Sequence, residues 1–494
     1  MNPHPFVRED RFFAGGEWLA PASGAHLESI DPSTEEVWAT VPDGDATDVG
    51  TAVTAARSAL DGPWSRLAPT RRGRLLTDLA ALVERDAARL GELESRDNGK
   101  PLRDTVGEVK RAAEWLRYYG GAADKIQGDV IPFRDQAHAY TRLEPVGVVG
   151  AITPWNSPIS LYSWKLGPAL ATGNTVVLKP AESTSVSALA LARLVEEAGI
   201  PAGVVNVVPG RGATAGDALT AHPGVDKVSF TGSYGTAQRI MRNAANGLKH
   251  VSFECGGKSP HLVFADADLD RAVAVATHSA FRSTGQSCSC GSRLLVQRTV
   301  YDEVLAALVA RTSRIRVGPA LDPATHIGPH TSAGQLAKTR AYIQLGLDEG
   351  GRVVTGGGRP AGLERGFYIE PTIFEGLGNG SRLAQEEVFG PVLTVIPFDT
   401  EDEAVAIAND TTYGLVGGLW TSDIGRAHRV SARMQAGLVS VNTFRPTHWM
   451  LPYGGYKQSG LGRENGFDAL REYVEVKTVV VDYADEEPTD PFAH

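Results

Sequence analysis

The 494-residue chain has an ordinary globular composition with 42% hydrophobic residues, enough for a large core spread over two or three domains. Its 48 Lys and Arg against 58 Asp and Glu give a net charge of −10, and because no basic cluster stands out, nucleic acid is not expected as a partner. Three cysteines exclude a disulfide framework, and the lack of an apolar leader or a membrane-length apolar run predicts a cytoplasmic protein that does not contact a membrane.

The first part of the chain mixes short strand patterns with helical patterns. Residues 36–41 are typical of a strand, and Asp45 is placed to cap a helix with Val49 and Val53 on one face. Helical spacing recurs in residues 75–83 and 106–116. We expect these apolar faces to be packing surfaces.

From Val146 onward, buried strands alternate with helices. The strand patterns cover residues 146–152, 175–178, 204–208, 227–230 and 250–253. This alternation predicts an α/β fold with a doubly wound, mainly parallel sheet, whose ligands bind at the carboxyl ends of the strands. No Gly-x-Gly-x-x-Gly fingerprint is present, so a standard Rossmann turn is not predicted.

A second α/β alternation runs from about residue 261 to 451. Its strand patterns cover residues 293–297, 393–398, 417–421 and 438–441. A last strand pattern, residues 474–481, has an edge that can pair elsewhere in the chain or in another subunit. The fold class we predict is therefore two doubly wound α/β domains with an additional small sheet.

Two of the cysteines stand in a Gly/Ser-rich connection, residues 283–293, between a helix pattern and a strand pattern. A thiol on such a connection can meet a substrate, which makes Cys288 a candidate nucleophile. A free cysteine is also commonly a small buried hydrophobe, but Ser287 and Ser289 are unusual neighbours for a core position. No metal site is expected, because Gly328-Pro329 separates the only closely spaced histidines, His326 and His330.

Several segments resemble signatures of the NAD(P)-dependent aldehyde dehydrogenase superfamily. Residues 253–260 (FECGGKSP) and 285–288 (GQSC) resemble its glutamate and cysteine signatures. Further matching motifs, in family order, are residues 153–156 (TPWN), 164–170 (WKLGPAL), 179–182 (KPAE), 230–233 (FTGS), 386–391 (EEVFGP) and 454–460 (GGYKQSG). The resemblance covers nearly the whole chain.

The resemblance implies a division of the chain into three regions. These are an NAD-binding domain (residues 1–123 and 147–255), a catalytic domain (256–455) and an oligomerisation or bridging region (124–146 and 456–494). It also implies a homodimer or homotetramer that acts on a small-molecule aldehyde.

Three residues carry the chemistry that the resemblance implies. Cys288 is the nucleophile, Asn156 donates to the oxyanion together with the Cys288 backbone N–H, and Glu254 is the general base that hydrolyses the thioester. A surface or helix-capping carboxylate is the alternative for Glu254. An acyl-transferring relative that uses coenzyme A, or a non-catalytic scaffold, would be expected to lack one or more of these residues, and all three are present.

The cofactor residues follow from the resemblance in the same way. They are Thr153, Trp155, Lys179, Glu182, Gly212, Gly232, Ser233, Glu387 and Phe389. Because a carboxylate accepts a hydrogen bond from the ribose 2′-hydroxyl and repels a 2′-phosphate, Glu182 favours NAD over NADP. The sequence departs from the family at Ala237, where a glycine is common.

The implied substrate pocket is unusually polar. Its residues are Ser157, Leu161, Trp164, Ser287, Ser289, Arg445, Thr447 and Tyr453. Since small hydroxyls supply hydrogen bonds and a guanidinium can clamp a carboxylate, we expect a polar aldehyde such as a carboxylate-bearing or amide-bearing semialdehyde. Two alternatives stay open: Arg445 in a surface ion pair, and an aromatic aldehyde stacked on Trp164, Trp449 and Tyr453.

The second cysteine of the connection has two interpretations. Cys290 either packs beneath the loop or forms a reversible disulfide with an oxidised Cys288.

Overall fold

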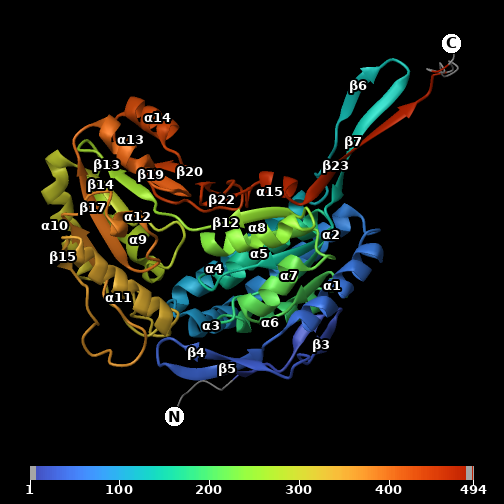
Figure 1. Cartoon of the computed structure of the whole chain (residues 1–494), viewed down its shortest axis with the longest axis horizontal. Coiled ribbons are helices and arrows are strands. Elements are labelled where there is room, and N and C mark those ends of the chain that lie inside the picture. The colour runs from blue at the N-terminus through green and yellow to red at the C-terminus, as the bar shows by residue number, and fades with distance from the viewer. Residues whose placement is uncertain (1–6, 485–491, 493–494) are drawn as a thin grey trace.

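The computed structural model describes residues 7–484 and 492, and it contains two α/β units and a projecting arm (Figure 1). One unit is built on an eight-stranded sheet and the other on a seven-stranded sheet. The arm is a three-stranded sheet that extends away from both units (Figure 1). The predicted fold class, two mainly parallel α/β domains and a small additional sheet, is confirmed.

In the eight-stranded sheet, the chain starts the parallel part at β8 (Val148–Ile152) and adds later strands first on one side of it and then on the other. In spatial order its strands are β22 (Gly460–Leu461), β12 (His250–Glu254), β11 (Lys227–Thr231), β8 (Val148–Ile152), β9 (Thr175–Lys179), β10 (Val205–Val207), β2 (Phe12–Ala14) and β3 (Glu17–Leu19). The five strands from β12 to β10 are parallel, and the chain adds β9 and β10 on one side of β8 before β11 and β12 return to the other. The ends of β8 and β11 therefore open a crevice of the kind that holds ligands in such sheets.

The helices of this unit follow from strong local signals. Asp45 caps α1 (Ala46–Asp61) with a capping box, as its position in the sequence predicts. Every residue of α5 (Pro158–Ala171) is buried, because α5 lies between the sheet and an outer layer. That layer consists of α2 (Pro69–Arg85), α3 (Ala87–Asn98) and α4 (Leu102–Ala122), which pack on α5 and on α6 (Val186–Glu197).

Three further helical elements stand at the carboxyl edge of this sheet. The π-helix η1 (Gly212–Gly216) leads into α7 (Asp217–Ala221) after β10, and α8 (Tyr234–Ala245) follows β11. Ser233 caps α8 by accepting a hydrogen bond from the Thr236 amide. The start of α8 thus faces the crevice with backbone N–H groups that have no helical partner.

The seven-stranded sheet forms the second unit. In spatial order its strands are β15 (Arg352–Thr355), β16 (Thr372–Glu375), β17 (Val392–Phe398), β14 (Arg293–Gln297), β13 (Pro260–Val263), β19 (Val416–Trp420) and β20 (Leu438–Val441). All pairs are parallel except β15 with β16. Its helices are α9 (Leu269–Phe281), α10 (Tyr301–Thr312), α11 (Ala333–Asp348), α12 (Arg382–Gln385), α13 (Glu401–Asn409) and α14 (Ile424–Arg433).

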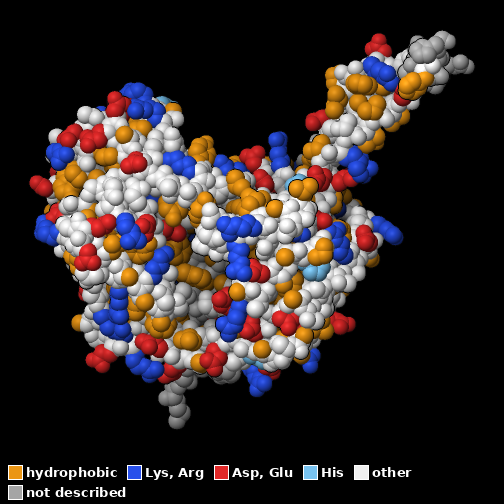
Figure 2. Space-filling model, viewed as in Figure 1, with side chains coloured by type: hydrophobic (Ala, Val, Ile, Leu, Met, Phe, Trp, Pro, Cys, Tyr) orange, Lys and Arg blue, Asp and Glu red, His pale blue; other side chains and the backbone are white. Residues whose placement is uncertain are grey.

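The last strand predicted from the sequence, residues 474–481, lies in the projecting arm. β23 (Val474–Asp482) pairs antiparallel along its whole length with β7 (Ala137–Pro145) of the same chain, and β6 (Val130–Arg134) pairs with β7 on the other side. Figure 2 shows hydrophobic side chains along this arm. Val130, Phe133 and Val476 are 74%, 58% and 65% exposed, so the arm presents apolar surface that the described residues do not cover.

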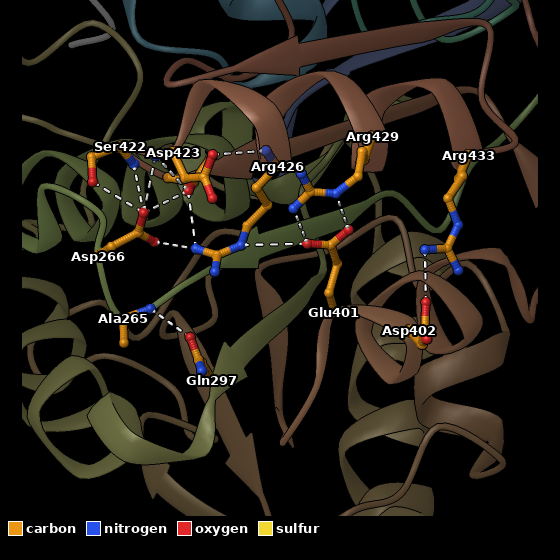
Figure 3. Close-up of polar contacts among 11 residues, drawn as sticks. Ala265, Asp266, Gln297, Glu401, Asp402, Ser422, Asp423, Arg426, Arg429 and Arg433 are labelled. Carbon is orange, nitrogen blue, oxygen red and sulfur yellow. Dashed lines mark hydrogen bonds and ion pairs between the residues drawn. The ribbon is translucent and has the colours of Figure 1, made fainter.

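An ion-pair cluster ties α13 and α14 to the end of β13 (Figure 3). Arg426 lies between Asp266 and Glu401, at 2.6 and 3.6 Å. Arg429 pairs with Glu401 at 2.9 Å, and Arg433 pairs with Asp402 at 2.8 Å. These three arginines each face a carboxylate on the outer surface of the unit.

The remaining elements form a small three-stranded sheet, a two-stranded sheet and three short helices. They are β1 (Val7–Arg8), β4 (His26–Asp31), β5 (Glu36–Pro42), β18 (Tyr413–Gly414), β21 (Tyr456–Lys457), the 3-10 helices η2 (Arg282–Gly285) and η3 (Arg298–Val300), and α15 (Asp468–Arg471). The strand predicted at residues 36–41 is β5, within one residue. Among the described residues, no helix is long and apolar enough to cross a membrane.

Candidate functional site

A cavity of about 430 Å³ lies where the strand ends of the first unit meet the cysteine loop of the second. It brings together Asn156 after β8, Glu254 at the end of β12, and Cys288 between η2 and β14. These are the three residues expected to carry chemistry. The substrate residues expected from the sequence also line it: Ser157, Leu161, Trp164, Ser287, Ser289, Arg445, Thr447 and Tyr453.

The cysteine loop is held in an unusual backbone conformation. Ser283, Thr284 and Gly285 follow one another with φ of 55°, 57° and 66°, in the left-handed region that non-glycine residues rarely adopt. A Cβ on Gly285 would stand 2.2 Å from the Gly390 carbonyl oxygen, so only glycine fits there. The strain is maintained because neighbouring segments hold the loop on both sides.

Gln286 provides much of that hold. Its Oε1 accepts a hydrogen bond from the Thr331 amide and contacts His330 Nδ1, both at 3.0 Å. Burial lowers the pKa of His330 to about 3, so the imidazole stays neutral and serves as a structural partner. No local pattern in the sequence indicates this role of His330, which was expected only not to bind a metal.

The Cys288 thiol is half-buried and faces an aromatic hydroxyl. Its Sγ lies 3.6 Å from the Tyr453 Oη. Burial raises the pKa of the thiol to about 11, against the lowering effect of the Tyr453 hydrogen bond. Because the thiolate is the reactive form, its abundance depends on whatever stabilises negative charge at this sulfur.

Asn156 points its side-chain amide at the same loop. Its Nδ2 donates to the Gln286 carbonyl at 3.0 Å, and the side chain is 8% exposed. An amide nitrogen carries two hydrogens, so one remains to donate into the cavity. Asn156 Oδ1 is buried without a hydrogen-bond partner among the described residues.

Glu254 is neither a surface carboxylate nor a helix cap. It is 4% exposed, and its Oε2 has no hydrogen-bond partner in the described part of the chain. Burial first, and then the nearby Glu464 carboxylate, raise the pKa of Glu254 well above its usual range. Lys165 forms a buried ion pair with Glu464 and opposes that rise. The sequence argument did not identify Lys165 or Glu464 as neighbours of the carboxylate.

Five of the expected cofactor residues line the cavity: Trp155, Gly232, Ser233, Glu387 and Phe389. Trp155 and Phe389 meet edge to face, with ring centroids 5.3 Å apart. Glu387 Oε1 accepts from the Gly257 amide at 3.1 Å, and burial raises the pKa of Glu387 to about 7.

The other four expected cofactor residues lie outside the cavity lining. Glu182 Oε2 accepts from the Gly212 amide at 3.2 Å and lies 3.7 Å from Lys179 Nζ, so these three form one group at the ends of β9 and β10. Thr153 is buried directly after β8, and its amide donates to the Lys179 carbonyl. Glu182 is exposed, with 51% of its side chain accessible.

The polar wall of the cavity contains Arg445, which the sequence predicts, and Arg282, which it does not. Arg445 Nη1 donates to Ser287 Oγ at 2.7 Å and to Ser289 Oγ at 3.4 Å. Among residues 7–484 and 492, no carboxylate lies within ion-pair distance of Arg445, so the alternative of a surface ion pair is wrong. Arg282 also lines the cavity, and its Nε is buried without a hydrogen-bond partner in the described chain.

Helix α4 adds charge to this wall, where we predicted only packing. Its residues Glu108 and Arg111 line the cavity. Lys100 Nζ donates to Glu108 Oε2 at 2.5 Å and to Ser157 Oγ at 2.7 Å. Although burial opposes it, the Lys100 ammonium holds the pKa of Glu108 below its usual range. Ser157 thus belongs to a fixed polar cluster.

Aromatic rings form another part of the cavity wall. Trp164 stacks on Trp115 at 5.6 Å and meets Tyr453 edge to face at 5.3 Å. Trp115, Trp164 and Tyr453 line the cavity. Trp449, expected as a wall residue for an aromatic aldehyde, instead packs on Trp115 outside the lining.

The other two cysteines differ in their surroundings. Cys290 is buried, and its Sγ donates to the Ala280 carbonyl at 3.3 Å, which is a packing contact. Cys255 lines the cavity and packs against the core of the first unit. Within the described ranges, no group of three or more His, Cys, Asp or Glu residues is placed to hold a metal ion.

Comparison with known proteins assigns the chain and its fold to one family. Residues 18–479 match the aldehyde dehydrogenase family. Betaine aldehyde dehydrogenase of Bacillus subtilis is 46% identical over 472 residues, covering 94% of this chain and 96% of the relative. Human mitochondrial aldehyde dehydrogenase is 45% identical over 485 residues, covering 97% of this chain and 93% of the relative.

Solved structures agree along nearly the whole chain. The NAD⁺ complex of aldehyde dehydrogenase from Bacillus cereus has a TM-score of 0.95 and 43% identity, covering 96% of this chain and 97% of that one. An NAD⁺ complex of betaine aldehyde dehydrogenase from Staphylococcus aureus has a TM-score of 0.96 at 38% identity, covering 98% and 97%. This chain belongs to the aldehyde dehydrogenase family and is an oxidoreductase of that family.

Proposed function

We propose that the protein oxidises a polar, carboxylate-bearing aldehyde to the corresponding acid with NAD as the hydride acceptor. The observation that carries the proposal is the meeting of Cys288, Asn156 and Glu254 in one cavity. A thiol, an amide donor and a carboxylate with a raised pKa are the groups that thioester chemistry requires.

The crevice residues fit a dinucleotide. A Cβ on Gly256 would stand 2.2 Å from the Glu387 carboxylate, so glycine is what lets Glu387 reach the cavity. Thr231 Oγ1 is buried without a partner among the described residues, beside the start of α8, where a phosphate would be favoured. Glu182, near Lys179, would accept a ribose hydroxyl, which favours NAD over NADP. When bound, NAD supplies the nicotinamide that accepts a hydride.

Cys288 and Asn156 would carry the first half of the reaction. The Cys288 thiolate attacks the aldehyde carbon, a C–S bond forms, and the carbonyl oxygen becomes an oxyanion. The free Asn156 N–H and the Cys288 backbone N–H donate to that oxyanion. Loss of hydride from the tetrahedral carbon leaves a thioester on Cys288.

Glu254 would carry the second half. It removes a proton from a water molecule as the oxygen attacks the thioester, and the C–S bond breaks to release the acid and the cysteine sulfur. Its raised pKa makes it a stronger base once ionised, and the Lys165–Glu464 pair lies near enough to influence that ionisation.

The substrate class follows from Arg445, which has no carboxylate partner among the described residues, whereas Arg282 pairs with Asp104 at 3.5 Å. Arg445 is partly buried, desolvation lowers the pKa of its guanidinium, and its two serine contacts do not neutralise the charge. A substrate carboxylate would supply the missing negative charge with bidentate geometry. The betaine aldehyde of the two named relatives is not favoured here, because guanidinium groups repel a cationic head group.

An aromatic aldehyde is the second candidate, supported by the edge-to-face arrangement of Trp164 and Tyr453. A flat ring would lie against this wall without using Arg445. The two candidates therefore differ in their dependence on that residue.

The three regions expected from the sequence remain our proposed division of the chain, with boundaries at residues 123, 146, 255 and 455. We assign the arm to subunit contact, because Val130, Phe133 and Val476 would leave water in a homodimer or homotetramer. Sedimentation of the intact protein tests this assignment: a monomer at micromolar concentration would contradict it.

The activity is tested by mixing the protein with NAD and succinic semialdehyde, benzaldehyde or octanal while following absorbance at 340 nm. We expect the highest kcat/KM for succinic semialdehyde. A preference for octanal would contradict the polar pocket, and turnover that required added coenzyme A would favour acyl transfer.

A further inference from the structure

The hydroxyl of Tyr453 lies beside the reacting sulfur, and the function proposed above gives it no role. Its Oη lies 3.6 Å from Cys288 Sγ, within hydrogen-bond range for sulfur, and the residue is 3% exposed. As a wall for substrate, a phenylalanine would suffice at this position. The oxygen therefore needs its own explanation.

The ring is held in place from two sides. The Tyr453 amide donates to the Glu464 carbonyl at 2.6 Å, and the Glu464 amide donates back at 2.7 Å. Trp164 meets the ring at 5.3 Å with an interplanar angle of 68°. Because Glu464 is itself anchored by the buried Lys165 ion pair, the phenol has little freedom to turn away from the sulfur.

We propose that Tyr453 is a catalytic residue whose hydroxyl donates a hydrogen bond to the Cys288 thiolate and thereby increases the fraction of ionised sulfur. The proposal rests on the proposed role of Cys288 as the nucleophile. It concerns the free enzyme before substrate attack, so it holds for any aldehyde.

The direction of the hydrogen bond follows from the chemistry of the two groups. Burial, together with the neighbouring thiol and carboxylate, raises the pKa of Tyr453 well above its usual range, so the phenol keeps its proton. A thiolate has no hydrogen, and only Tyr453 can then donate. The thiol proton leaves for solvent or buffer, and no proton passes through the phenol.

The expected increase in the reactivity of the Cys288 sulfur can be calculated approximately. A hydrogen bond to a charged group lowers its free energy enough to move a pKa by about one to two units. A thiol with a pKa near 11 gains about tenfold in thiolate at neutral pH for each unit removed. Since each thiolate becomes about threefold less nucleophilic per unit, the net gain in rate is about threefold.

The test is the pH dependence of alkylation of the free enzyme by iodoacetamide, with the modified peptide identified by mass spectrometry. Tyr453→Phe keeps the ring and its contact with Trp164 and removes only the oxygen. We expect the apparent pKa for alkylation of Cys288 to rise by about one unit and the rate at pH 8 to fall about threefold.

Tyr368→Phe is the matched control, because that phenol is also buried and donates a single hydrogen bond, to the Ser33 carbonyl at 3.2 Å, away from the cavity. It should leave the alkylation profile of Cys288 unchanged. A general loss of packing in either variant would appear as a lower thermal midpoint without a shift in the profile.

Two results would overturn the proposal. One is an unchanged alkylation profile in Tyr453→Phe with an altered KM for aldehydes, which would make Tyr453 a wall residue only. The other is an apparent pKa that falls in the variant. If Cys288→Ala retained oxidation, the nucleophile assignment itself would fail, and the alkylation measurement, which needs neither aldehyde nor NAD, keeps the two failures apart.

Discussion

The cavity and the outer ion-pair cluster of Figure 3 treat charge in opposite ways. In the cluster, Arg426, Arg429 and Arg433 each lie within 4.0 Å of a carboxylate. In the cavity, Arg445 has only serine hydroxyls, and Glu254 Oε2 has no partner among the described residues. Both regions are rich in charge, but in the cavity the charge of Arg445 has no carboxylate partner among the described residues.

The difference separates structural from functional charge. Buried polar groups usually have a hydrogen-bond partner, and Asn156 Oδ1, Glu254 Oε2 and Arg282 Nε, which line one cavity with a thiol, lack one among the described residues, so we expect a ligand to complete the site. Paired, solvent-exposed charges need no such completion and contribute little to stability. Substitutions in the cavity should therefore change activity far more than stability, and substitutions in the cluster should change neither much.

The largest effect is expected for Cys288→Ala. Removing the nucleophile should lower kcat for aldehyde oxidation by about 10⁴-fold or more, because the thioester can then no longer form on Cys288. Binding of NAD, followed by calorimetry, should persist. Near wild-type turnover in Cys288→Ala would mean that the nucleophile is Cys255 or Cys290. The contrast between the cavity around Cys288 and the ion-pair cluster would then lose its basis.

Glu254→Gln should be the next most severe change. Acylation still proceeds, so we expect a burst of absorbance at 340 nm followed by a steady rate that is about 10²–10³-fold lower. Because the pKa of Glu254 is raised, the wild-type rate of deacylation should increase with pH as the carboxylate ionises, and the variant should lose that dependence. A variant with normal steady turnover would assign the base to another residue.

Arg445→Ala should produce a smaller and selective loss. Removing a charge-assisted contact should lower kcat/KM for succinic semialdehyde by about 10- to 100-fold and leave benzaldehyde nearly unchanged. Arg445→Lys, which retains the charge without the planar fork, should fall between the two. Equal losses for both aldehydes would mean that Arg445 only shapes the cysteine loop through Ser287 and Ser289.

The smallest effect is expected in the outer cluster. Asp402 pairs with Arg433 but its side chain is 85% exposed, so Asp402→Ala should shift the thermal midpoint by no more than about 2 °C and leave kcat/KM unaltered. Calorimetry and the absorbance assay measure the two quantities. A loss of activity here would show that the two regions are coupled and would weaken the contrast.

Local sequence patterns were enough to predict many of the strands and helices of this protein. The strand expected at residues 293–297 is β14, the pattern at 438–441 is β20, and Asp45 caps its helix as its position indicates. These features depend on periodicity and capping between residues that are close in the chain. The family motifs likewise lie in short continuous segments, and the family they indicate is confirmed.

What the tertiary structure alone decided is how distant segments complete the site. Tyr453 reaches the sulfur of Cys288, Arg282 and α4 add charge to the wall, and β23 finds its partner in β7 of the same chain. Each of these depends on side chains or strands brought together across long sequence separations, which no local period encodes. The burial that raises the pKa of Glu254 has the same origin, because it exists only once both units have packed around the cavity.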